Sequence, residues 1–169
     1  MKIYYREKSG GIEILRCFGI EGRVEIPGMI DDKLVISAAP YAFSSHMDEK
    51  EDLKNASLWE VSDGLEFGRE EHVLAGNDVE EIVFPYTLKE IGRYIFYGCG
   101  NLKKLEFSDS LMQIGCGAFT GCHALEKLTV HMRQGKKSGV KEMLGEMWQR
   151  IDVNFLYAVS YTHLRAHET

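Results

Sequence analysis

The sequence predicts a β-rich α/β fold in which short parallel strands stack as the turns of a solenoid. The first observation is a repeat, since residues 82–104 align without a gap with residues 105–127, at a constant offset and with nine identical positions. The second is that so short a unit cannot bury its own apolar face, so neighbouring units must stack. The third is the alternation in Leu105-Glu106-Phe107, which predicts one short strand in each unit.

Composition indicates one folded domain, which we place at residues 1–158. The chain has 169 residues, of which 44% are apolar and 27% are charged. No apolar run is long enough to cross a membrane, and the first residues, Met1-Lys2-Ile3-Tyr4-Tyr5, do not begin a secretory signal. We therefore expect a cytoplasmic protein without membrane insertion. A net charge of −6 argues against nucleic acid as a partner, because phosphate binding depends on Lys and Arg.

The N-terminal part is expected to form a cap and one divergent repeat. Residues 2–7 and 12–18 are predicted strands of a hairpin that turns at Ser9-Gly10-Gly11, so residues 1–19 form the cap. Residues 20–46 form the divergent repeat, because Val24-Glu25-Ile26-Pro27 resembles Ile82-Val83-Phe84-Pro85. The regular repeats occupy residues 79–130, and we expect about three coils in all.

An acidic insertion at residues 47–78 separates these two parts. Residues 47–72 contain nine acidic and three basic residues, and we expect a short helix at 49–59 followed by a loop. One hypothesis is a projection that binds a partner, with Trp59 as its anchor. The other is a solvated loop whose Leu53, Leu58 and Trp59 pack on the solenoid.

Residues 131–158 are expected to form a cap made of a helix and a strand. Apolar residues recur at helical spacing and predict an amphipathic helix over 138–150: Val140, Met143, Leu144, Met147 and Trp148. Alternation over residues 151–157 predicts a strand. This unit either closes the open end of the solenoid or begins a second domain.

The last residues, 159–169, resemble a translated sequencing adapter. We exclude Val-Ser-Tyr-Thr-His-Leu-Arg-Ala-His-Glu-Thr from the fold and expect the natural chain to continue beyond Ala158, so that the sequence is that of a truncated protein.

Two repeated positions are expected inside each coil. Phe96 and Phe119 fill the centre, where an aromatic ring buries a large area. Cys99 and Cys122 face the same way, as two buried thiols or as a pair close enough to bridge.

The repeats resemble the BspA-like leucine-rich repeat family. Residues 115–125, Gly-Cys-Gly-Ala-Phe-Thr-Gly-Cys-His-Ala-Leu, are a close instance of its pattern, and residues 91–102 are another. The resemblance implies a right-handed leucine-rich-repeat solenoid that binds proteins or cell surfaces and has no catalytic residues. Many relatives are secreted bacterial surface proteins, which implies a surface location as the alternative to the cytoplasm.

We expect no catalytic residues, no cofactor and no metal site. Cys122-His123 is the nearest approach to a nucleophile beside a base, but neighbours along a coil point in different directions. The histidines have no metal-ligand spacing, and no phosphate-binding glycine motif occurs.

A basic face near the last coils would be formed by Lys103, Lys104, Lys127, Arg133, Lys136, Lys137 and Lys141.

The leading hypothesis is a non-enzymatic module that binds an unidentified protein partner through its solenoid surface. The candidate contacts are Trp59, Glu80, Val83, Lys103, Glu106, Glu126 and Thr129. The alternatives are the recognition or regulatory arm of a longer enzyme and a cell-surface ligand module. The sequence defines neither the partner nor the oligomeric state.

Overall fold

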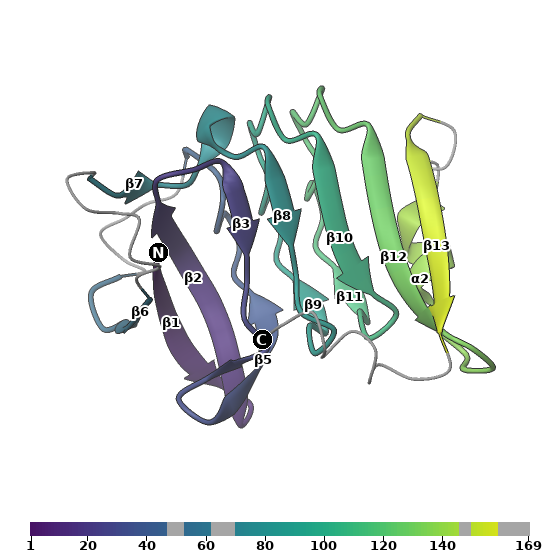
Figure 1. Ribbon diagram of the computed structural model, residues 1–169, viewed down its shortest axis with the longest axis horizontal. Helices are drawn as coiled ribbons and strands as arrows, with labels where there is room; N and C mark the ends of the chain where they lie inside the picture. The colour runs from purple at the N-terminus through teal and green to yellow at the C-terminus, as the bar shows by residue number, and fades with distance from the viewer. Residues whose placement is uncertain (47–52, 62–69, 146–149, 159–169) are drawn as a thin grey trace.

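The protein is seen here in a computed structural model that describes residues 1–46, 53–61, 70–145 and 150–158 (Figure 1). The strands of one sheet lie side by side in the order β3 (Arg23–Glu25), β8 (Glu81–Val83), β10 (Lys104–Ser108), β12 (Lys127–Arg133) and β13 (Asp152–Ala158). All pairings in this five-stranded sheet are parallel. The predicted parallel solenoid is confirmed, and its five strands exceed the predicted three coils.

A second sheet forms the other wall. Its strands follow the order β11 (Gln113–Ile114), β9 (Glu90–Ile91), β5 (Lys33–Ala38), β2 (Gly11–Gly19), β1 (Lys2–Lys8) and β6 (Ser57–Glu60). Two short strands lie off this path: β4 (Met29–Ile30) pairs with β5, and β7 (His72–Val73) pairs with β2. A 3-10 turn, η1 (Gly76–Asp78), precedes β8. The core fills the space between the two sheets.

The register of the five-stranded sheet repeats the offset in the sequence. Lys104 lies opposite Glu81 on one side and Lys127 on the other, and each step equals the offset between the two aligned repeats. One residue further along, Ile82, Leu105 and Leu128 form an inward row in which no side chain is more than 1% exposed. Since adjacent strands are about 4.8 Å apart, equivalent apolar side chains pack directly on one another and bury a continuous core.

A column of phenylalanine rings runs through the centre of successive turns. The ring centroids of Phe43 and Phe96 are 6.1 Å apart, and those of Phe96 and Phe119 are 5.7 Å apart. The backbone follows the same ladder, because Phe43 N donates to Ile95 O at 3.0 Å and Phe96 N to Ala118 O at 3.1 Å. The divergent repeat therefore supplies the first turn, with Phe43 at the repeated aromatic position.

The corners beside β9 and β11 stack so closely that only glycine fits. A Cβ atom on Gly92 would lie 2.3 Å from Pro40 N, and one on Gly115 would lie 2.2 Å from Arg93 N. Both neighbours are backbone atoms, so neither can rotate away. The glycine of the Ile-Gly pair in each repeat is therefore required by the spacing between turns.

The N-terminal hairpin covers the first turn, and its key contact is a buried carboxylate. Strand β2 pairs with β1 in antiparallel fashion and with β5 in parallel fashion. Glu13 on β2 is 1% exposed and accepts hydrogen bonds from Arg6 Nε at 2.7 Å and Lys8 Nζ at 3.0 Å. It also accepts one from Ser37 Oγ on β5 at 2.9 Å. Burial alone would raise the pKa of Glu13, but these hydrogen bonds outweigh it and leave that pKa below its ordinary value.

Arg16 fixes the other end of the same strand to the first turn. Its side chain is 2% exposed, and Nη1 donates to the carbonyl oxygens of Tyr41 at 3.0 Å, Ala42 at 3.1 Å and Ser44 at 2.6 Å. These carbonyls lie in a tight bend outside the two sheets, where Tyr41 O also accepts a hydrogen bond from Ser44 N at 2.9 Å. The guanidinium therefore supplies donors that a regular strand would otherwise provide.

The prediction of a helix at 49–59 is wrong where the structure describes it. Ser57–Glu60 is strand β6, which pairs with β1 so that Trp59 lies opposite Ile3. The free edge of β1 offers backbone hydrogen bonds that outweigh a weak local helix preference. Residues 49–52 lie outside the described residues.

The C-terminal helix is shorter than predicted. It spans only α2 (Val140–Leu144) rather than 138–150, because Gly145 at φ +50° ends it. Met147 and Trp148 lie outside the described residues. The strand expected at 151–157 is β13, which pairs in parallel with β12. Lys141 on α2 lies 4.9 Å from the centroid of the Phe155 ring, so a cation–π contact joins the helix to this last strand.

Replacing Gly115 with alanine is expected to destabilise the fold by about 3 kcal/mol, because the new methyl group collides with the backbone of the preceding turn. The matched control is Gly139→Ala, since a Cβ there meets nothing within 4 Å. Urea denaturation followed by circular dichroism measures both. Equal midpoints for the two variants would contradict the close stacking described above.

Candidate functional site

The outward face of the five-stranded sheet brings six of the seven predicted contact residues together. Val83, Glu106 and Thr129 are register partners on β8, β10 and β12, so they form one row across the sheet. A second row precedes the strands, because Lys103 N donates to Glu80 O at 2.8 Å and Glu126 N to Lys103 O at 3.1 Å. The prediction that all six are exposed strand positions needs correction. The first row is half-buried, and the second row lies just outside the strands.

Trp59 lies apart from this face. It belongs to β6, at the edge of the other sheet, where it is half-buried and packs against the core. Its contacts match the hypothesis in which Trp59 packs on the solenoid.

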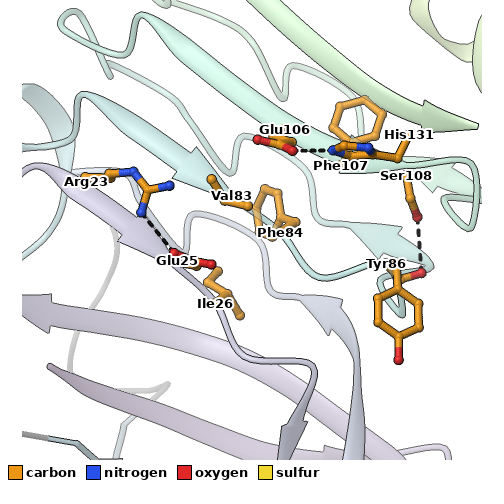
Figure 2. Close-up of a pocket in the computed structure, with 10 residues that line it drawn as sticks. All are labelled: Arg23, Glu25, Ile26, Val83, Phe84, Tyr86, Glu106, Phe107, Ser108 and His131. Atoms are coloured by element: carbon orange, nitrogen blue, oxygen red, sulfur yellow. Dashed lines mark hydrogen bonds and ion pairs between the residues drawn. The ribbon is translucent and has the colours of Figure 1, made fainter. Parts of the chain in front are cut away.

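A hollow of about 320 Å³ lies on the outward face near the ends of β3, β8 and β10 (Figure 2). Apolar residues line part of it: Ile26, Val83, Phe84 and Phe107, of which only Val83 is more than a few per cent exposed. Polar and charged groups line the rest, namely Arg23, Glu25, Tyr86, Glu106, Ser108 and His131. A smaller hollow of about 170 Å³ lies on the other side of Glu106, between β8, β10 and β12. Glu106 therefore stands between two depressions on one face.

The charges around the larger hollow are paired. His131 Nε2 donates to the Glu106 carboxylate, and Arg23 Nη1 donates to Glu25 Oε2 at 2.9 Å (Figure 2). The hydrogen bond from His131 holds the pKa of Glu106 below its ordinary value, against the opposing effect of burial. Glu106 is therefore ionised at neutral pH and accepts hydrogen bonds only.

Sequence reasoning did not single out Arg23, Glu25, Tyr86, Ser108 or His131 as site residues. A signal for three of them was present. Ser108 and His131 are separated by the repeat offset and are register partners. Once Glu106 is placed on the outward face, the alternation of a strand places Ser108 there as well. Glu25 follows in the same way from its pairing with Val83.

The chemistry of the described residues gives no support for a metal site or a reactive nucleophile on this face. No group of three or more His, Cys, Asp or Glu in the described ranges is arranged to hold a metal ion. All four cysteines are free. Cys99 Sγ donates to Phe43 O at 3.2 Å, and Cys122 Sγ donates to Phe96 O at 3.3 Å, each toward the preceding turn. Burial raises the pKa of both thiols to about 12, so they stay protonated at neutral pH.

Comparison with known families agrees with the repeat seen in the structure. Residues 70–141 match the family model described as a BspA type leucine rich repeat region, in six copies. This segment therefore carries leucine-rich repeats of the BspA type. No curated protein matches the chain.

Two solved structures resemble the chain. One is a leucine rich cell surface protein from Faecalibacterium prausnitzii A2-165, at 18% identity and a TM-score of 0.48, covering 77% of this chain and 31% of that protein. The other is the leucine rich repeat protein of T. pallidum, at 21% identity and a TM-score of 0.37, covering 92% of this chain and 80% of that protein. The chain thus spans less than a third of the Faecalibacterium protein. In the part of the chain that the structure describes, no helix is long and apolar enough to span a bilayer.

We expect one thiol per folded chain to react quickly with Ellman's reagent at pH 8, and four after unfolding in urea. Cys116 is exposed, whereas Cys17 is fully buried and burial raises its pKa to about 12. A thiol with a pKa of about 12, as at Cys99 and Cys122, has on the order of one thiolate in ten thousand molecules at that pH. The Cys116→Ser variant should lose the fast phase. Two fast thiols in the native protein would contradict the packing of Cys122.

Proposed function

We propose that the chain is a leucine-rich-repeat scaffold that binds another protein through the outward face of its five-stranded sheet and acts without catalysis. The observation that carries this proposal is the in-register row of Val83, Glu106 and Thr129, with a hollow on each side of Glu106. Hydrogen bonds between the strands fix the backbone and the spacing of these rows, so binding orders little further backbone. Such a preorganised surface can use its contacts for affinity.

The distribution of charge on this face favours a protein partner over nucleic acid. In the row before the strands, Lys103 lies between Glu80 and Glu126. In the next row, Lys104 and Lys127 are neighbours, with Glu81 on one side of them and Asp152 on the other. Both rows therefore balance the two signs of charge, whereas binding of a phosphate backbone depends on an excess of Lys and Arg. A mixed surface instead selects a partner with a complementary pattern of both signs.

The larger hollow is suited to a side chain that anchors the partner. Phe84 and Phe107 face the core beneath the hollow and are almost fully buried, so half-buried Val83 supplies the apolar side chain that a partner would contact. The Arg23–Glu25 ion pair and the His131–Glu106 hydrogen bond at its rim are already formed, so an aromatic or aliphatic side chain can enter without leaving a new charge unpaired.

The test is site-specific photo-crosslinking in cells of the native host. A photoreactive amino acid at Thr129, on the face, should give a discrete adduct with one protein. The same amino acid at exposed Arg93, in a corner beside β9, is the matched control and should give none. Excess unlabelled protein should compete with the adduct. Adducts of equal yield from both positions would refute binding through this face.

In the same assay, Glu106→Lys should reduce the adduct from Thr129 by at least tenfold, because it reverses the charge between the two hollows. Glu60→Lys, on exposed β6, controls for the change in net charge and should leave the yield unchanged. Thermal unfolding separates loss of binding from loss of fold. An unchanged yield for a folded Glu106→Lys protein would exclude Glu106 from the interface.

A further inference from the structure

A second concave surface lies along the turns by which the chain leaves the five-stranded sheet. It is a groove of about 680 Å³. Four successive turns of the solenoid line it, and its residues belong to segments 34–36, 86–89, 109–112 and 133–143. Tyr86 borders both this groove and the larger hollow of the outward face, so the two depressions are neighbours on different surfaces.

The floor of the groove is apolar and unusually exposed. Met112 is 73% exposed and Leu34 is 45% exposed, and Ile36, Leu111 and Met143 continue the apolar lining. Two large apolar side chains this exposed on one concave surface favour a binding site, because burying them releases water from apolar area.

The rim of the groove is basic. Lys89, Lys136 and Lys137 are exposed, and none of them makes an ion pair within the described ranges of the chain. The single acidic residue of the lining, Asp109, has a fully buried side chain and already accepts a hydrogen bond from Arg133 N at 2.8 Å. Arg133 Nε lies 3.5 Å from the same carboxylate. Among the residues that the structure describes, these three lysines thus have no ion-pair partner beside the apolar floor, in a chain whose net charge is −6.

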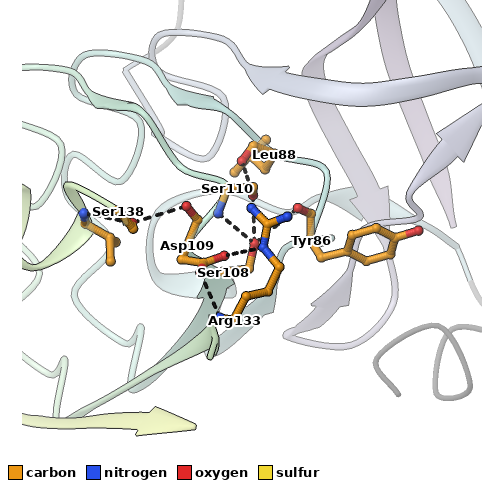
Figure 3. Close-up of polar contacts among 8 residues, drawn as sticks. Tyr86, Leu88, Ser108, Asp109, Ser110, Arg133 and Ser138 are labelled. Atoms are coloured by element: carbon orange, nitrogen blue, oxygen red, sulfur yellow. Dashed lines mark hydrogen bonds and ion pairs between the residues drawn. The ribbon is translucent and has the colours of Figure 1, made fainter. Parts of the chain in front are cut away.

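Hydrogen bonds between the turns hold the wall of the groove in place (Figure 3). Ser108 Oγ donates to Tyr86 O at 3.1 Å, and Ser110 Oγ donates to Leu88 O at 2.6 Å. On the other side, Ser138 Oγ donates to Asp109 O at 3.3 Å. These contacts join three consecutive turns, so the groove is preorganised rather than formed by its occupant.

We propose that this groove binds an acidic peptide segment in which carboxylate and apolar side chains alternate. The alternation matches the two features of the site, since apolar side chains reach the floor while carboxylates meet the lysines of the rim. Four turns are separated by three steps of about 4.8 Å, so the groove is about 14 Å long. This length corresponds to about four residues of extended chain at ~3.3 Å each. The site is separate from the outward face and its occupant is a second partner segment.

The test is fluorescence anisotropy with a rhodamine-labelled, capped octapeptide of alternating Asp and Leu. Binding should weaken by tenfold or more in the double variant Lys136→Glu with Lys137→Glu. The matched control is Lys54→Glu with Arg93→Glu, which makes the same charge change at exposed positions outside both surfaces and should alter affinity by less than twofold. Met112→Ser should weaken binding severalfold. All of these positions are exposed, so the variants should keep their unfolding temperature.

Two control probes make the proposal falsifiable. An octapeptide of alternating Asp and Ser should bind at least tenfold more weakly, and equal affinity would overturn the role of the apolar floor. Vesicles of phosphatidylglycerol and phosphatidylcholine should not bind. Binding to vesicles but not to the Asp-Leu peptide would assign the groove to a membrane surface and overturn the proposal. Because crosslinking from Thr129 reports only on the outward face, either proposal can fail without the other.

Discussion

Hydrogen bonding between the backbones of successive turns, at the constant offset of the repeat, is the constraint on which the rest of the structure depends. It places Ile82, Leu105 and Leu128 in one buried row and Val83, Glu106 and Thr129 in one outward row. It also brings turns so close at one corner that Gly92 and Gly115 have no room for a Cβ atom. Core packing, surface pattern and glycine usage are thus three results of one periodicity.

The features that repeat along the chain could be predicted from the sequence alone. Nine identities at a fixed offset predict the stacked strands, the phenylalanine column and the alternation that turns Glu106 outward. The N-terminal hairpin could also be predicted, because glycines separate two alternating segments. In each case a local pattern and the packing of the turns favour the same structure.

Features that depend on a single partner could not be predicted in this way. Ser57–Glu60 becomes a strand because β1 has a free edge, and no local pattern records that edge. Helix α2 ends at Gly145, although the apolar spacing alone would carry it further. The two hollows beside Glu106 and the basic groove each combine residues from three or more turns. Their shape follows from side-chain sizes in neighbouring turns rather than from any one segment.

The anchoring of the hairpin by Arg16 has a consequence for the order in which the protein assembles. The carbonyls of Tyr41, Ala42 and Ser44 are satisfied by a residue that precedes them in the chain. During synthesis the hairpin therefore leaves the ribosome before the turn that it supports. The hairpin alone is only marginally stable in water, and its strands gain their partners β5, β6 and β7 later in the chain. The cap and the first turn therefore become stable together, once the residues up to β7 have been synthesised.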